Sequence, residues 1–221
     1  MTSASPERRQ AASIPEQLAD WYQVNTRYVA IGAGVVVAAG LGYWFYTENA
    51  QRTARVSEQQ LMNARRSMAT GNIPLAQTDL KRIVDNHANT RAGVEAALLL
   101  SETYFQDRKF AEGIDVLDDF TTSGKAEYVR SKIYSLIGDG QMELGQTAEA
   151  AGSYRKAAEA ARFEGDKAQQ RAKQARALTA AGDTAAARSL WADLVKDPSP
   201  GVAAEARVRV GELAAKPATR S

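Results

Sequence analysis

Residues 145–157 have the sequence GQTAEAAGSYRKA, and their pattern decides the fold of most of the chain. Gly145 and a polar residue come first, the small Ala150 follows, and Tyr154 and Ala157 come four and seven residues after Ala150. Spacings of four and seven place side chains on one face of an α-helix. Glycine adopts the positive φ of a tight turn without steric cost. The stretch therefore predicts a turn followed by an amphipathic helix.

The same pattern recurs every 37 residues along the chain. The small position holds Ala76, Gly113, Ala150 and Ala187. The positions four and seven residues later hold Leu80 and Ile83, Leu117 and Phe120, Tyr154 and Ala157, and Trp191 and Leu194. The turns begin with Gly71, Arg108, Gly145 and Gly182. Another amphipathic stretch precedes each turn, so each unit is predicted to be a helical hairpin.

These units resemble the tetratricopeptide repeat, a helical hairpin of about 34 residues. Its positions are matched in the second, third and fourth units by Ser101, Tyr104, Gly113, Leu117 and Phe120, by Gly138, Gln141, Ala150, Tyr154 and Ala157, and by Ala175, Leu178, Ala187, Trp191 and Leu194. The first unit matches only in its second helix, and the longer period implies longer loops. The resemblance implies a solenoid of about four hairpins, over about residues 55–90, 91–126, 127–163 and 167–200. A helix over residues 202–215 is expected to cap its last exposed face.

Residues 28–46, YVAIGAGVVVAAGLGYWFY, contain no ionised side chain. A helix of this length covers roughly 28 Å, about the thickness of the hydrocarbon core of a bilayer. Aromatic residues gather at both ends, where amphipathic rings favour the headgroup region. The alternatives are a helix buried in a soluble core and a cleaved signal peptide. A signal peptide has an apolar region of about 7–15 residues with a small-residue cleavage site, whereas this longer segment ends in four aromatic residues. We therefore predict an uncleaved transmembrane helix.

The predicted fold class is all-α: a single N-terminal transmembrane helix followed by a tetratricopeptide-like solenoid and a C-terminal capping helix. We divide the chain into a polar leader (1–27), the transmembrane helix (28–46), the repeat domain (47–215) and a tail (216–221). Between Gly42 and Gly71 there is neither glycine nor proline. The transmembrane helix is therefore expected to continue without a break into the first hairpin, as a rigid stalk.

Arginines lie on both sides of the apolar segment, so the positive-inside rule does not decide its orientation. The layout favours a bacterial inner membrane with the C-terminal domain in the periplasm. Within the segment, small residues recur every four positions and form one stripe on the helix. Such stripes let another transmembrane helix approach closely. The residues predicted to pack in this way are Ala30, Gly34, Ala38 and Gly42.

The composition argues against several classes of function. Without cysteine the chain has no disulfide, thiolate metal site or cysteine nucleophile, and its single histidine, His87, would leave a zinc site to carboxylates alone. The net charge of +2 lacks the marked basic excess that is usual in duplex-binding proteins. No nucleophile with a neighbouring base can be identified. We expect no cofactor, no metal, no nucleic-acid partner and no catalysis.

What remains for function is a protein-binding surface. In repeat stacks of the tetratricopeptide type, the first helix of each unit lines a groove. The resemblance assigns the following residues to that groove: Leu61, Arg65, Met68, Leu98, Glu102, Phe105, Lys132, Asp139, Met142 and Arg176. Methionine-bearing surfaces suit adaptable contacts with apolar segments. The alternative for Leu61, Leu98 and Phe105 is ordinary packing between helices.

The layout as a whole is similar to the YfgM-like family, ancillary subunits of the bacterial SecYEG translocon. The similarity rests on the aromatic end of the apolar segment, Gly42 to Tyr46, and on the closing unit, Gly182 to Trp191. It implies a non-catalytic adaptor that meets translocating chains or chaperones beside the channel. The alternative is a structural accessory subunit that braces a respiratory, photosynthetic or envelope-assembly complex. In both cases the partners are other proteins and the chain is attached to a membrane.

Overall fold

The computed structural model describes residues 26–215, and every regular element within that range is helical. The chain divides into two units, residues 1–52 and residues 53–221. The described part of the first unit belongs to helix α2 (Thr26–Ala69), which is continuous, as the absence of glycine and proline between Gly42 and Gly71 predicts. Residues 1–25 of the leader, which include the aromatic residues Trp21 and Tyr22, and the tail (216–221) lie outside the described residues.

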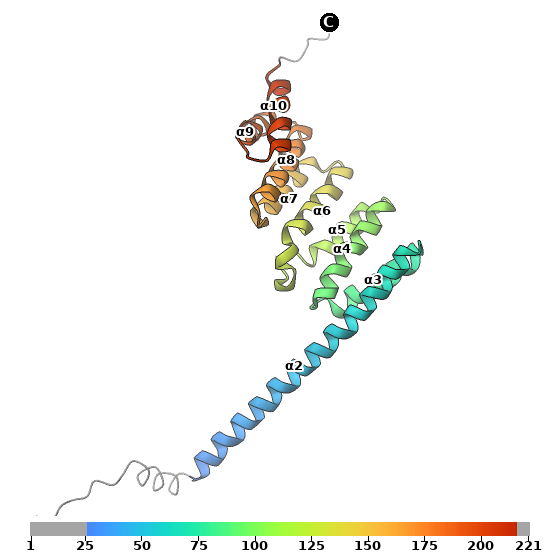
Figure 1. The fold of residues 1–221 in the computed structure, drawn as a ribbon, viewed down its shortest axis with the longest axis vertical. Coiled ribbons are helices and arrows are strands. Elements are labelled where there is room, and N and C mark those ends of the chain that lie inside the picture. The colour runs from blue at the N-terminus through green and yellow to red at the C-terminus, as the bar shows by residue number, and fades with distance from the viewer. Residues whose placement is uncertain (1–25, 216–221) are drawn as a thin grey trace, which may run out of the picture. The chain divides into compact units, whose positions relative to one another are not determined.

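The second unit consists of four helical hairpins and a closing helix (Figure 1). The first hairpin is residues 53–69 of α2 with α3 (Ile73–His87), and the second is α4 (Arg91–Gln106) with α5 (Phe110–Asp118). The third is α6 (Arg130–Glu143) with α7 (Thr147–Ala160), and the fourth is α8 (Glu164–Ala180) with α9 (Thr184–Leu194). Helix α10 (Pro200–Ala214) closes the stack. The predicted solenoid of four hairpins with a cap is confirmed.

All four turns within hairpins have the same geometry. In the first, the N–H of Gly71 donates to the carbonyl of Met68 at 3.0 Å and the N–H of Asn72 donates to that of Ser67 at 2.9 Å. This is the Schellman motif, which requires a left-handed residue after the helix. Within residues 26–215, the positive-φ positions are the four turn residues of the 37-residue pattern, namely Gly71, Arg108, Gly145 and Gly182.

The repeated small and large positions form the core. The small residues Ala76, Ala150 and Ala187 are each 0% exposed, and Gly113 is buried. The apolar residues that follow them, all large except Ala157, are each 4% exposed or less: Leu80, Ile83, Leu117, Phe120, Tyr154, Ala157, Trp191 and Leu194. The pattern seen in residues 145–157 is therefore the seam along which each second helix packs.

One element has no counterpart in the repeat pattern. The 3₁₀-helix η1 (Gly124–Val129) lies between the second and third hairpins. Helix α5 ends at Asp118, so Phe120 enters the core from the turn that follows the helix. Ala126 of η1 is also buried in that core cluster. The longer connection thus contributes apolar contacts of its own.

Candidate protein-binding surface

Nine of the ten predicted groove residues occupy three repeat positions, and the structure gives each position a different environment. The tenth, Lys132, is at a fourth position and pairs with Glu102 of the second. The first of these positions belongs to the core. Leu61 is 1% exposed and Leu98 is 6% exposed, and each packs in a core cluster between hairpins. Ser135 and Ala172, at the equivalent positions of the third and fourth units, are buried as well. Leu61 and Leu98 therefore stabilise the stack and offer no surface to a partner.

The second position forms a ladder of ion pairs. Its members are spaced 37 residues apart, and each pairs with a residue on the first helix of the next hairpin or, at the end, on α10. We call this set the ion-pair ladder. It consists of Arg65–Glu95 at 2.6 Å, Glu102–Lys132 at 2.8 Å, Asp139–Lys173 at 2.8 Å and Arg176–Glu205 at 2.5 Å. Each pair has opposite charges, although the sign at the repeated position changes along the chain.

Asp139 is the most extensively bonded member of the ladder. Its carboxylate accepts from Nζ of Lys173 at both oxygens, at 2.8 and 2.9 Å, and from the Tyr154 hydroxyl at 2.7 Å. Lys173 also donates to Oγ of Ser135 at 3.0 Å. Burial, together with the hydrogen bond to Asp139, raises the pKa of Tyr154 well above its usual range. The phenol is therefore a fixed donor that ties α7 to the ladder.

The last rung joins α8 to the closing helix. Both Nε and Nη2 of Arg176 donate to the two carboxylate oxygens of Glu205, at 2.7 and 2.5 Å. Two parallel hydrogen bonds of this kind fix the relative orientation of the two groups. The hydrogen bonds from Arg176 lower the pKa of Glu205 below its usual value.

The third position holds half-buried apolar side chains, Met68, Phe105 and Met142. Phe105 lies against its own hairpin and the next one. A methyl group at Gly113 would lie 2.4 Å from Cε1 of its ring, and one at Gly140 would lie 2.7 Å from Cζ. Two glycines thus make room for one aromatic ring between α4, α5 and α6. Phe105 packs as core on one side, whereas Met142 borders open space.

A cavity of about 320 Å³ opens beside Met142, between the first helices of the third and fourth hairpins. Its wall consists of Asp139, Met142, Glu143, Tyr154, Lys173 and Arg176. A second cavity of about 260 Å³ shares Arg176 and extends toward Arg209 of α10. The structure therefore brings Asp139, Met142 and Arg176 together around one opening. Arg65 and Met68 lie at the other end of the repeat series, in the first hairpin.

Three of the eight ladder residues were not among the predicted groove residues. Lys173 and Glu205 complete two rungs and were not assigned to the surface, and Glu95 was not among the selected groove residues. The sequence feature that could have identified them is a charge of opposite sign 29 to 34 residues after each ladder position. Among residues 26–215, no group of three or more His, Cys, Asp or Glu side chains could hold a metal ion.

The apolar segment of α2 is exposed along its length. Every side chain described between residues 26 and 46 is exposed, and a methyl group at Gly34 or Gly42 would meet nothing within 4 Å. Ala30 and Ala38 are exposed as well. By length and composition, α2 is the one helix among the described residues that could cross a membrane. The packing assigned to the small-residue stripe remains a prediction.

No family model matches the chain, and a search of curated proteins gives no match either. The chain is similar in structure to crystal structures of TPR-like repeats from Podosopora anserina that are described as nearly identical repeats of a kinesin light chain. One is a single-substitution variant, with a TM-score of 0.55 and 17% sequence identity over 73% of this chain and 85% of that chain. The other has a TM-score of 0.53 and 16% identity, over 73% of this chain and 86% of that chain.

The repeat geometry and these similarities define the class of protein. The second unit is a tetratricopeptide-like solenoid. Because the identity to the solved structures is low, the similarity establishes the fold alone.

Proposed function

We propose that the chain is a membrane-anchored adaptor that holds another protein on the first-helix surface of its repeat domain. The observation that carries this proposal is the pair of openings at Met142 and Arg176, where an apolar side chain lies among charged groups. An apolar side chain surrounded by charged groups suits a partner segment that has both apolar and polar side chains. The exposed apolar segment of α2 supports attachment to a membrane.

The resemblance to the YfgM-like family supports a cellular location for this adaptor. We propose that it is anchored in a bacterial inner membrane beside a protein translocation channel, with the repeat domain in the periplasm. There the first-helix surface would meet translocating chains or chaperones. A reporter fused after Ser221 tests the orientation, because alkaline phosphatase is active in the periplasm and inactive in the cytoplasm. An inactive phosphatase fusion would contradict the assigned side.

The second candidate is a structural accessory subunit that braces a larger respiratory, photosynthetic or envelope-assembly complex. The stripe of Ala30, Gly34, Ala38 and Gly42 favours it, because a stripe of small residues suits permanent packing against another transmembrane helix. An adaptor should exchange its partners, whereas a structural subunit should have fixed stoichiometry. Purification in mild detergent followed by quantitative mass spectrometry of the co-isolated proteins separates the two. A stoichiometric partner set without translocon subunits would favour the structural subunit.

The surface itself is tested by Met142→Ser. This change removes the apolar wall of the 320 Å³ opening, so recovery of co-isolated partners should fall several-fold. Leu144→Ser is the matched control, since Leu144 is 43% exposed at the end of the same helix and does not line the opening. Circular dichroism should show folded protein for both. Equal recovery with both variants would mean that the partner binds elsewhere.

A further inference from the structure

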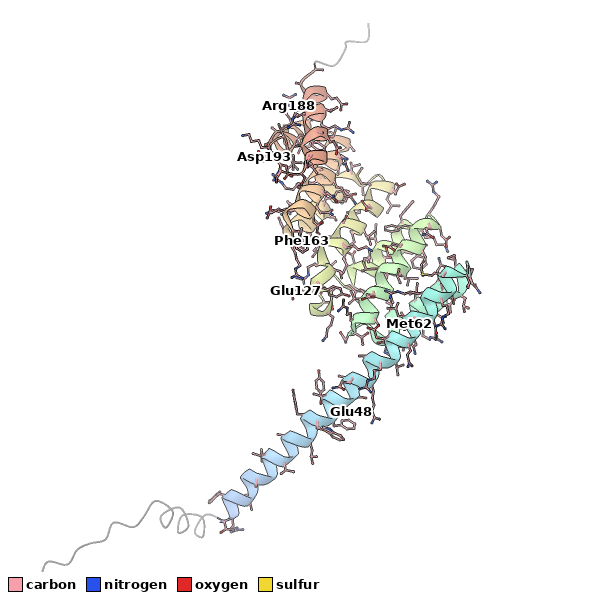
Figure 2. All side chains as sticks on the ribbon, viewed as in Figure 1. Glu48, Met62, Glu127, Phe163, Arg188 and Asp193 are labelled. Atoms are coloured by element: carbon pink, nitrogen blue, oxygen red, sulfur yellow. The ribbon has the colours of Figure 1, made fainter. Side chains whose placement is uncertain are left out.

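A separate cleft lies at the edge of the stack where the second, third and fourth hairpins follow one another. It is the largest of the cavities described, at about 630 Å³, and its wall includes Glu127, Tyr128, Arg130, Ala160 and Arg162. A neighbouring cavity of about 270 Å³ shares Tyr128, Ala160 and Arg162 and reaches Phe163. Figure 2 shows Glu127 and Phe163 on the same side of the ribbon. The two cavities therefore form one continuous cleft between η1 and the α7–α8 connection.

The cleft contains two arginines that lack a carboxylate partner among the described residues. Arg162 is exposed and takes part in none of the ion pairs described. The guanidinium of Arg130 makes one long hydrogen bond, in which Nη2 donates to the Ser123 carbonyl at 3.4 Å, and its Nε is buried without an acceptor. A guanidinium has five N–H donors and favours planar anions that accept two of them. Two such groups in one cleft leave strong donors available to a ligand.

The charges at the rim limit what that ligand can be. Glu127 lines the larger cavity and Asp166 lines the smaller one, and neither forms an ion pair with the arginines. These carboxylates repel an extended anionic surface, such as a phospholipid bilayer or nucleic acid. A ligand with one or two carboxylates can contact the arginines while it avoids the rim. The charge pattern therefore favours a short acidic segment of a protein.

Two aromatic side chains flank the arginines. Phe163 is 68% exposed and Tyr128 is 38% exposed. The Tyr128 ring is held in place, because the guanidinium of Arg91 lies 4.7 Å from its centroid and its hydroxyl donates to Glu95 at 3.5 Å. Exposed aromatic rings beside unpaired arginines are the residue types that contribute most to protein interfaces. An apolar side chain next to a carboxylate would complement both features.

We propose that this cleft binds an acidic, extended segment of a partner protein, with a carboxylate on Arg130 and Arg162 and an apolar side chain on Phe163. The inference rests on the proposed function in that the repeat domain binds proteins. It adds a second contact region, formed by η1, the α7–α8 connection and the N-terminal half of α6, where the ladder residue Lys132 lines the smaller cavity. The opening at Met142 and this cleft have no lining residue in common.

The test measures fluorescence anisotropy with the full chain in detergent micelles. The probe is a labelled peptide of sequence Ser-Asp-Glu-Leu-Ser, the reference peptide is Ser-Asn-Gln-Leu-Ser, and both have an amidated C-terminus. Because the predicted contacts are charge-assisted, Arg162→Gln should weaken binding of the acidic peptide about tenfold or more. Glu127→Gln, which removes a repelling carboxylate from the rim, should strengthen binding. Arg207→Gln is the control, since Arg207 is an exposed arginine of α10 outside the cleft.

Several outcomes would overturn the proposal. They are equal affinity for the acidic and neutral peptides, equal affinity of Arg162→Gln and Arg207→Gln, or absence of peptide binding. Binding to phosphatidylglycerol vesicles that requires Arg162, without peptide binding, would assign the cleft to a lipid surface instead. Arg130→Gln is a second variant of the cleft, and it should also weaken binding of the acidic peptide. The proposed function is judged independently, because loss of partners with Met142→Ser does not depend on Arg162.

Discussion

At Arg108 the backbone has a φ of 60°, in a turn where the other three hairpins place glycine. A non-glycine residue in the left-handed region costs roughly 1–2 kcal/mol, because Cβ approaches the carbonyl oxygen. The surrounding turn makes the same two hydrogen bonds as the others, with Arg108 N–H to Phe105 at 3.0 Å and Lys109 N–H to Tyr104 at 2.8 Å. The strain is therefore confined to one residue.

Replacing Arg108 with glycine should remove this strain. We expect Arg108→Gly to stabilise the repeat domain by about 1 kcal/mol, after allowance for the greater freedom of glycine in the unfolded chain. The measurement is the midpoint of urea unfolding followed by circular dichroism. Gly145→Ala, at the equivalent turn, should lower the midpoint. The account of the turn is wrong if Arg108→Gly also lowers it.

At position 138 glycine is required for a different reason: the space beside it is limited, whereas its backbone conformation is ordinary. A methyl group there would lie 2.7 Å from Cε1 of Tyr154, whose hydroxyl bonds to Asp139. Gly138→Ala should therefore displace the ring and destabilise the domain by about 1–3 kcal/mol. Gly152→Ala is the control, because nothing lies within 4 Å of an added methyl group and alanine favours the helix. Thermal unfolding of both variants should show shifts of opposite sign.

At the scale of elements, the ion-pair ladder fixes the register between consecutive first helices. Its side chains are between 26% and 54% exposed, so each rung contributes less than about 1 kcal/mol. The main stabilisation comes from the buried core between the hairpins, to which Leu61 and Leu98 of the first helices belong. The ladder instead selects which residues of neighbouring helices face each other, since a slip of one turn would separate every pair.

The ion pair between Arg176 and Glu205 makes the stability of the folded state depend on pH, and the sign of that dependence follows from the pKa of Glu205. The pKa of Glu205 is lowered by Arg176 from a reference of 4.5, so the folded state favours the carboxylate. The stabilisation is present above pH 4.5 and is lost as the pH falls through the lowered pKa. We expect Glu205→Gln to unfold at a lower temperature than the unmodified chain at pH 7, and the difference to shrink progressively as the pH falls below 4.5. A difference that is constant over this range would contradict the assignment.

The second helices could be predicted from the sequence because their signal is local. Ala150, Tyr154 and Ala157 fall on one face through helix geometry alone, and the same spacing recurs in each unit. The rung from Asp139 to Lys173 could not be predicted, since its partners are 34 residues apart and meet only after two hairpins pack. The 3₁₀-helix at residues 124–129 was missed because it lies outside the repeat period. The cleft at Arg130 depends on that helix and was missed with it.

At the scale of the whole molecule, the proposed attachment to a membrane rests on the apolar segment of α2. If residues 28–46 cross a bilayer, the chain should stay in the membrane pellet after alkaline carbonate extraction. Replacing both Val36 and Val37 with arginine puts two charges near the middle of the segment, so the chain should move to the soluble fraction. Val56→Arg is the control, because Val56 is exposed on the same helix outside the apolar segment. Pelleting of the double variant would argue against a spanning helix.

The ladder also bears on the mechanics of the solenoid. Neighbouring first helices are joined by exposed ion pairs at the surface and by buried apolar contacts below them, so we expect bending to lengthen the ion pairs before it opens the core. A weak contact that breaks and reforms allows elastic bending without unfolding. Raising the ionic strength screens exposed charges and should make the repeat domain more compliant. The four ion pairs therefore make the bending stiffness of the repeat domain depend on salt concentration. A bound partner that supplies a charge of its own would change that stiffness.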